Sequence, residues 1–174
     1  MKTLHLIRHA KSSWDFPNLS DHQRPLNKRG EKDSLLMSTE LLRAGFKWPE
    51  IFCSSAQRAQ LTIRNLMKPW FNHRADQLIQ SNQATNWQTD DRLYTFSCAD
   101  IWAYVNQIDE ALDAAVLVGH NPAFTDFINS ASNANLNNLP TCAYAQLVFS
   151  AKHWSEVRFG SAVLQKFLKP KMFK

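Results

Sequence analysis

Two arginines and two histidines follow short apolar segments at separate places in the sequence. Arg8 and His9 form one pair, and Arg58 and His120 lie far along the chain. The apolar runs that precede these residues span 4–7, 51–53 and 114–118. Arginine binds phosphate oxygens through paired hydrogen bonds and keeps its charge at any physiological pH. A neutral histidine offers a nucleophilic ring nitrogen. Together they indicate phosphoryl transfer, in which His9 attacks phosphorus and His120 donates a hydrogen bond to the developing charge.

The elements that must position these side chains have the pattern of an α/β protein. Residues 114–118 are apolar throughout, which is typical of a strand buried on both faces of a parallel sheet. Strand-like runs alternate with helical patterns, which predicts a mostly parallel sheet. Because ligands bind beyond the carboxyl ends of such strands, we expect the arginines and histidines to converge there.

The first helix is predicted between Asn27, a residue type that caps helices, and Gly45, a typical helix stop. Four residues at helical spacing are expected to face the sheet: Leu35, Leu36, Thr39 and Leu42. The other predicted elements are strands at Thr3–Ile7, Ile51–Cys53 and Ala114–Val118, a helix after Ser54-Ser55, a helix from Cys98 to Leu112, and paired strands at Ala143–Phe149 and Glu156–Phe167. No structure is predicted for residues 72–92.

Composition limits the classes of protein. A chain of 174 residues with 44% hydrophobic composition predicts one domain spanning residues 1–174. The formal charge of +5 favours anionic partners, but no helix with a basic stripe supports nucleic-acid binding. The basic residues near the end are expected to form a solvated terminus: Lys166, Lys169, Lys171 and Lys174.

Three cysteines, Cys53, Cys98 and Cys142, lack the spacing of a disulfide framework or a zinc site, so we expect them to pack as small apolar residues. We expect neither a secretory leader nor a membrane span, because the run 2–7 is interrupted by His5 and ends in Arg8-His9, and no apolar run of membrane-spanning length follows. These features predict a cytoplasmic protein without a membrane partner.

Three motifs resemble, in order and spacing, those of the histidine phosphatase superfamily: "RHAKSSW", "SSAQRAQLT" and "VGHNP". Within that phosphoglycerate mutase-like group, "DHQRPLNKRG" is similar to the SixA-type phosphohistidine phosphatases, and the likeness spans residues 3 to about 128. The resemblance implies a three-layer α/β/α sandwich and a reaction without cofactor or metal. It implies that His9 is phosphorylated in turn, that Arg8 and Arg58 grip the phosphoryl group, and that His120 completes the pocket. Ser12 and Asn121 are expected to bind substrate, Ser12 by lining the loop and Asn121 through a backbone or side-chain contact.

The expected substrate is a histidine-phosphorylated protein, either a phosphotransfer domain or a phosphocarrier, and the enzyme is expected to act as a monomer that releases phosphate ion. Many relatives that cleave phosphate esters carry a carboxylate general acid where this chain has Thr95, in "DDRLYTFS". An imidazole leaving group needs less help from an acid than an alkoxide does, so the missing acid favours phosphohistidine. The alternatives are a phosphatase of small phosphate monoesters that uses Asp90 or Asp91 as acid, and a non-catalytic phosphate-binding module.

Two further expectations concern the loop after the first strand. Asp21 and Arg24 are expected to order this loop through an ion pair, or else to reach the substrate. Trp14 is expected to cover the edge of the pocket or to pack locally.

Overall fold

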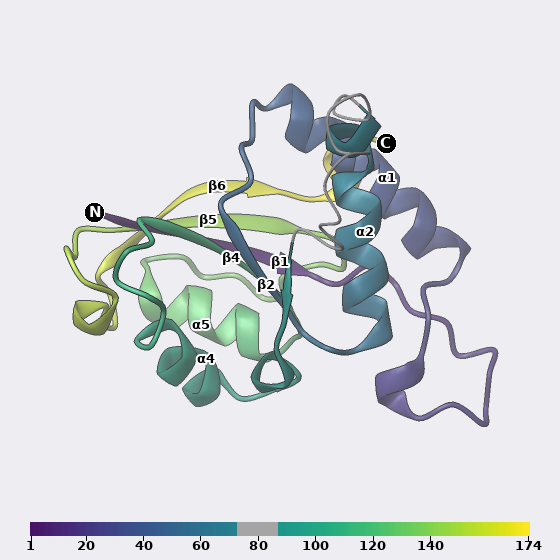
Figure 1. Ribbon diagram of the computed structural model, residues 1–174, viewed down its shortest axis with the longest axis horizontal. Helices are drawn as coiled ribbons and strands as arrows, with labels where there is room; N and C mark the ends of the chain where they lie inside the picture. Colours follow the sequence, from purple (N-terminus) through teal and green to yellow (C-terminus); the bar gives the residue numbers. More distant parts are fainter. Residues whose placement is uncertain (73–86) are drawn as a thin grey trace, which may run out of the picture.

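A six-stranded sheet forms the centre of the computed structural model, which describes residues 1–72 and 87–174 (Figure 1). The strands are β1 (Lys2–Arg8), β2 (Glu50–Cys53), β3 (Gln88–Thr89), β4 (Ala114–Gly119), β5 (Tyr144–Phe149) and β6 (Ala162–Leu168). Their order is β3-β2-β4-β1-β5-β6. The pairs β2–β3, β2–β4 and β1–β4 are parallel, and β5 is antiparallel to both of its neighbours. The mostly parallel sheet is therefore confirmed.

Helices cover both faces of this sheet. They are α1 (Lys28–Arg43), α2 (Gln57–Asn72), α4 (Cys98–Val105) and α5 (Ala123–Ala131). Helices α1 and α2 lie on one face, and α4 and α5 lie on the other (Figure 1). The predicted three-layer α/β/α sandwich is confirmed. None of the helices within residues 1–72 and 87–174 combines the length and apolar character that a membrane span needs.

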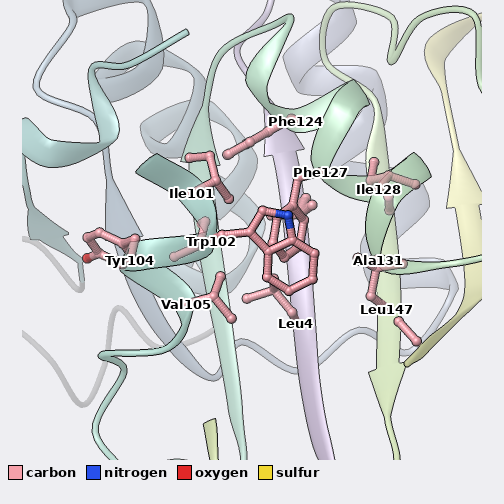
Figure 2. Close-up of a cluster of buried hydrophobic side chains, with 14 of the residues drawn as sticks. Leu4, Ile101, Trp102, Tyr104, Val105, Phe124, Phe127, Ile128, Ala131 and Leu147 are labelled. Atoms are coloured by element: carbon pink, nitrogen blue, oxygen red, sulfur yellow. The ribbon is translucent and has the colours of Figure 1, made fainter. Parts of the chain in front are cut away.

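Alternation along β1 divides the core between the two faces. Leu4 and Leu6 point into the cluster under α4 and α5, whereas Ile7 points into the cluster under α1 and α2. Figure 2 shows the first cluster, in which Trp102 and Phe127 lie over Leu4; their ring centroids are 4.5 Å apart. Because helices cover both faces of the sheet, β1 ends in a buried position. The residues that directly follow β1 are therefore fixed by the packing around them.

The ends of α1 agree with the prediction, but its buried face does not. Asn27 accepts a hydrogen bond from the Gly30 amide at 2.9 Å, and Gly45 has a φ of 69° after the last turn. The expected face, however, is wrong, because Leu35 and Leu42 are exposed. The buried face is formed instead by Asp33, Ser34, Met37, Ser38 and Leu41.

Hydrogen bonding between the two helices explains this difference. The Ser38 hydroxyl donates to the backbone oxygen of Leu66 at 2.6 Å, and Asn65 donates to the Ser34 hydroxyl at 2.9 Å. Small polar residues thus let α1 and α2 approach closely, and a pattern based on apolar residues alone misses such a face.

Several other boundaries differ from the prediction. Helix α4 ends at Val105 instead of Leu112, because the chain turns at Asn106, whose amide donates to the backbone oxygens of Trp154 and Val157. The last strand begins at Ala162 instead of Glu156, and α5 was not predicted. Of the stretch 72–92, residues 73–86 lie outside the described part of the chain.

The sequence also led to predictions for the three cysteines and for the basic residues near the C-terminus. Cys53 and Cys142 are buried as expected, and Cys98 is half-buried. Lys174 is exposed, as expected of a solvated tail, and its Nζ also lies 2.6 Å from a carboxylate oxygen of the buried Asp33. The tail therefore packs against α1.

Burial keeps a histidine neutral in the sheet. His5 lies on β1 with its Nδ1 atom 2.8 Å from the Tyr144 hydroxyl and its ring against Phe46. Burial, assisted by the charge of Lys166, lowers the pKa of His5 to about 4. An unfolded histidine takes up a proton near pH 6.5, so the unfolded state gains the proton first as the pH falls.

We predict that His5→Asn flattens the pH dependence of stability. Between pH 7.5 and pH 5 the wild type should lose about 2 kcal/mol more unfolding free energy than the variant, as measured by urea denaturation. The exposed His153 offers a control, since His153→Asn should follow the wild type. Equal pH dependence in wild type and His5→Asn would contradict the prediction.

Candidate active site

The carboxyl ends of three neighbouring strands bring the predicted residues together. Arg8 and His9 follow β1, His120 follows β4, and Arg58 lies in the first turn of α2, just beyond β2. Since β4 lies between β2 and β1, these side chains meet at one edge of the sheet. The ring centroids of His9 and His120 are 5.0 Å apart. Arg58 reaches both rings, with Nε 3.3 Å from His9 Nε2 and Nη2 3.4 Å from His120 Nδ1.

The contacts of His9 fix which ring nitrogen carries the proton. Its Nδ1 lies 2.7 Å from the backbone oxygen of Ala10, which only accepts hydrogen bonds, so Nδ1 is the donor. The lone pair therefore lies on Nε2 and faces Arg58. Burial lowers the pKa of His9 to about 3, and the positive charges of Arg58 and Arg8 act in the same direction. The hydrogen bond to Ala10 acts to raise this pKa but does not outweigh them. His9 is therefore a neutral imidazole at physiological pH, and its Nε2 lone pair accepts a hydrogen bond from Arg58.

His120 has the opposite tautomer. Arginine only donates, so Nδ1 of His120 accepts from Arg58 and Nε2 donates to the Ser54 hydroxyl at 2.8 Å. Burial, followed by the proximity of His9 and Arg58, lowers the pKa of His120 to about 2. The predicted hydrogen bond from His120 to a phosphoryl oxygen would have to come from Nδ1, which carries no proton in this tautomer. Nδ1 would first have to take up a proton, and an adjacent dianionic phosphoryl group favours that uptake.

Arg8 is held from behind by a loop before β5. Its Nη1 donates to the backbone oxygen of Leu139 at 2.6 Å and to Asn138 Oδ1 at 3.1 Å. Its buried Nε has no hydrogen-bond partner among the described residues, and so can serve a bound oxyanion. Asn121, which follows His120 after β4, reaches the same loop, where its side-chain amide donates to Asn138 Oδ1 and to the backbone oxygen of Leu139. Asn121 therefore supports Arg8, and its expected contact with substrate stays a prediction.

A cavity of about 180 Å³ lies over His9. It is lined by Arg8, His9, Lys11, Ser12, Trp14, Asp21, Arg24, Arg58 and Thr141. Four of these side chains are cations and one is a carboxylate, which suits a doubly charged oxyanion. Ser12 lines the cavity as expected, although its hydroxyl accepts a hydrogen bond from Arg24 Nη2 at 2.8 Å.

The loop over the cavity is ordered by the predicted ion pair. Arg24 Nη1 lies 2.9 Å from Asp21 Oδ1, which confirms that pair. The ring of Trp14 lies 3.2 Å from the Arg24 guanidinium while the side chain stays 73% exposed, so Trp14 covers the edge of the pocket as expected. Asp21 also binds Arg58, which is 37 positions away, and no sequence pattern predicts this contact.

The candidate acids of the alternative interpretation lie outside this cavity. Asp90 accepts hydrogen bonds from Arg92 and Tyr104, and Thr95 donates to Asp100 at 2.6 Å. Asp91 is exposed and does not line the cavity. In the part of the chain that the structure describes, no group of three His, Cys, Asp or Glu side chains is arranged to hold a metal ion.

Helix α1 packs directly on the loop that follows His9. A Cβ atom on Gly30 would lie 2.1 Å from the backbone oxygen of Lys11, which also accepts a hydrogen bond from the Asn27 amide at 3.0 Å. Only glycine allows this approach, so the first turn of α1 sets the path of the cavity floor.

Several solved structures with the same architecture are phosphatases. The protein histidine phosphatase SixA, complexed with tungstate, has a TM-score of 0.73 at 19% sequence identity, over 99% of each chain. A protein from Agrobacterium tumefaciens assigned as a phosphohistidine phosphatase, SixA, has a TM-score of 0.74 at 19% identity, over 97% of this chain and 99% of that chain. The chain has the fold of the SixA phosphohistidine phosphatases.

The SixA fold agrees with the resemblance found in the sequence motifs. A mycobacterial glucosyl-3-phosphoglycerate phosphatase has the same fold, with a TM-score of 0.62 at 14% identity over 94% of this chain and 98% of that chain. Small phosphate esters are thus also substrates of enzymes built on this architecture.

Sequence comparison adds relatives of other kinds. No protein-family model matches the sequence. An uncharacterized chloroplastic protein of Arabidopsis thaliana is 28% identical over 169 residues, which cover 89% of this chain and 70% of that protein. A 2,3-bisphosphoglycerate-dependent phosphoglycerate mutase of Bartonella henselae is 32% identical over 69 residues, or 38% of this chain and 34% of the mutase. The likeness to the mutase is therefore partial.

We predict that Gly30→Ala damages both stability and the pocket. The new methyl group must displace the backbone of Lys11, which should lower the unfolding free energy by about 2 kcal/mol and weaken orthovanadate binding at least tenfold. Urea denaturation and isothermal titration measure these effects. The control is Lys32→Ala on the exposed side of α1. If Gly30→Ala matches that control in both measurements, the helix does not constrain the loop.

Proposed function

We propose that this protein hydrolyses phosphohistidine on other proteins through a phospho-His9 intermediate. One observation carries the proposal: the unprotonated Nε2 of a neutral His9 lies against Arg58 at the base of a cationic cavity. Such a cavity binds an oxyanion, and such a nitrogen attacks phosphorus. The tungstate in the related SixA structure supports the same use of the pocket, since tungstate is a phosphate analogue.

In the first step, His9 Nε2 attacks the phosphorus atom. The P–N bond to the partner's histidine breaks, and its electron pair returns to that nitrogen; because the other ring nitrogen already carries a proton, the leaving group is a neutral imidazole. Arg58 moves its Nε hydrogen bond from His9 to a phosphoryl oxygen, and Arg8 supplies its unpartnered Nε. Both cations are already in place, so charge stabilisation requires little rearrangement.

In the second step, water attacks the phosphorus atom of phospho-His9. The bond to Nε2 breaks, phosphate leaves, and the electron pair returns to a neutral His9. The hydrogen bond from His9 Nδ1 to Ala10 keeps the ring in one orientation and one tautomer through both steps.

The carboxylate of the pocket favours a phosphoramidate over an ester. Of the described residues that line the cavity, Asp21 is the one carboxylate. Burial acts to raise its pKa, but hydrogen bonds from Tyr94 and Arg58 outweigh that effect and lower the pKa. Asp21 therefore stays ionised and cannot donate a proton to an alkoxide. An imidazole leaving group does not need that acid.

The second candidate is a phosphatase of small phosphate esters. It is favoured by the glucosyl-3-phosphoglycerate phosphatase that shares the fold. A non-catalytic binding module is disfavoured, because a binder has no need for a neutral, buried nucleophile.

We predict that a histidine-phosphorylated phosphotransfer domain loses phosphate in the presence of the wild type, and that His9→Ala reduces the rate at least a thousandfold. The reason is that His9 is the one histidine among the described residues that line the cavity. Phosphate release and phosphoprotein gels would follow the reaction over time.

The matched control is His153→Ala, an exposed histidine that should keep the wild-type rate. Release that is equally fast with His9→Ala would contradict the assignment. Release from a panel of small phosphomonoesters, with none from phosphohistidine, would favour the second candidate.

A further inference from the structure

Arg58 presents two different edges to its surroundings. The side edge, made of Nε and one hydrogen of Nη2, faces the two histidines at 3.3 Å and 3.4 Å. The end edge, made of Nη1 and the other hydrogen of Nη2, faces the loop that carries Asp21. A phosphoryl group on His9 would meet the side edge, so the orientation of the guanidinium plane decides how well Arg58 binds it.

Asp21 binds the end edge at two points. Its backbone oxygen accepts from Arg58 Nη1, and its carboxylate oxygen Oδ2 accepts from Nη2 at 2.9 Å. Arg58 is 3% exposed, which makes these contacts strong and leaves the guanidinium little freedom.

Asp21 is itself fixed by other parts of the chain. Tyr94 donates its hydroxyl hydrogen to Oδ2 at 2.8 Å, and Arg24 donates to Oδ1 at 2.9 Å. The neighbouring His22 contacts the Ser55 hydroxyl at 2.9 Å, just before α2. Arg58 and Tyr94, both distant in sequence, and the nearby Arg24 therefore hold this one carboxylate, and the His22 contact ties the same loop to the start of α2.

We propose that Asp21 is a positioning residue, which holds the end edge of Arg58 so that its side edge is aimed at the phosphoryl group on His9. The inference rests on the proposed function for the identity of that group. Asp21 takes no part in bond making or breaking; it acts through Arg58.

An electrostatic role and a positioning role of Asp21 predict opposite changes in oxyanion affinity when its carboxylate is removed. Loss of a negative charge from the cavity would, by electrostatics alone, strengthen the binding of an oxyanion. Loss of the support for Arg58 would weaken it. The direction of the change in oxyanion affinity therefore distinguishes an electrostatic role of Asp21 from a positioning role. If Asp21 only stabilised the fold, a variant of unchanged stability would bind the oxyanion with unchanged affinity.

We predict that Asp21→Ala binds orthovanadate at least tenfold more weakly than the wild type, as measured by isothermal titration. Tyr94→Phe, which removes only the tyrosine hydrogen bond to Asp21, should weaken binding two- to fivefold. Arg58→Ala sets the scale of complete loss. Because the Asp21 side chain is 46% exposed, thermal unfolding should show that Asp21→Ala and Tyr94→Phe remain folded at the temperature of the titration.

The matched control is Asp15→Ala in the same loop, whose carboxylate contacts only Ser13 among the described residues. It removes the same charge and should change orthovanadate affinity less than twofold. Unchanged or tighter binding by Asp21→Ala would overturn the proposal. Orthovanadate binding does not depend on the substrate, so a wild type that binds orthovanadate but releases no phosphate from phosphohistidine would contradict the proposed function alone.

Discussion

The contact between Arg58 and the unprotonated nitrogen of His9 is the constraint on which the site depends. A buried guanidinium 3.3 Å from an imidazole tolerates only a neutral ring, with its lone pair toward the arginine. The Ala10 backbone oxygen fixes the proton on the other nitrogen. One arrangement thus makes His9 a nucleophile and places a cation beside the atom it attacks.

The rest of the fold serves to hold these two groups together. The parallel arrangement of β1, β4 and β2 brings three chain segments to one edge of the sheet, and backbone hydrogen bonds from His9 to Gly119 and from Ser54 to Val118 continue the pairing past the strands. Helix α1 approaches the loop after His9 through Gly30. The loop around Asp21 closes the cavity from the other side, so the oxyanion pocket is built before any substrate binds.

The local parts of this arrangement could be predicted from the sequence, and the tertiary parts could not. Asn27 and Gly45 mark the ends of α1 through backbone chemistry that acts within a few residues. The prediction of the buried face of α1 is wrong because Ser38 is buried through a hydrogen bond to the backbone of α2. A search for periodic apolar residues cannot reveal such a contact. The pairing of Asp21 with Arg58 likewise depends on how distant segments pack, so only its pairing with the nearby Arg24 could be expected.

The protonation state of His9 tests the account most directly. Nitrogen-15 NMR of the imidazole ring, with the signals assigned by comparison with His9→Ala, reports both the tautomer and the pKa. The account predicts a ring that is still neutral at pH 5, protonated at Nδ1 and unprotonated at Nε2. An imidazolium at pH 5, or a neutral ring protonated at Nε2, would contradict the claim that His9 is held as a nucleophile beside Arg58.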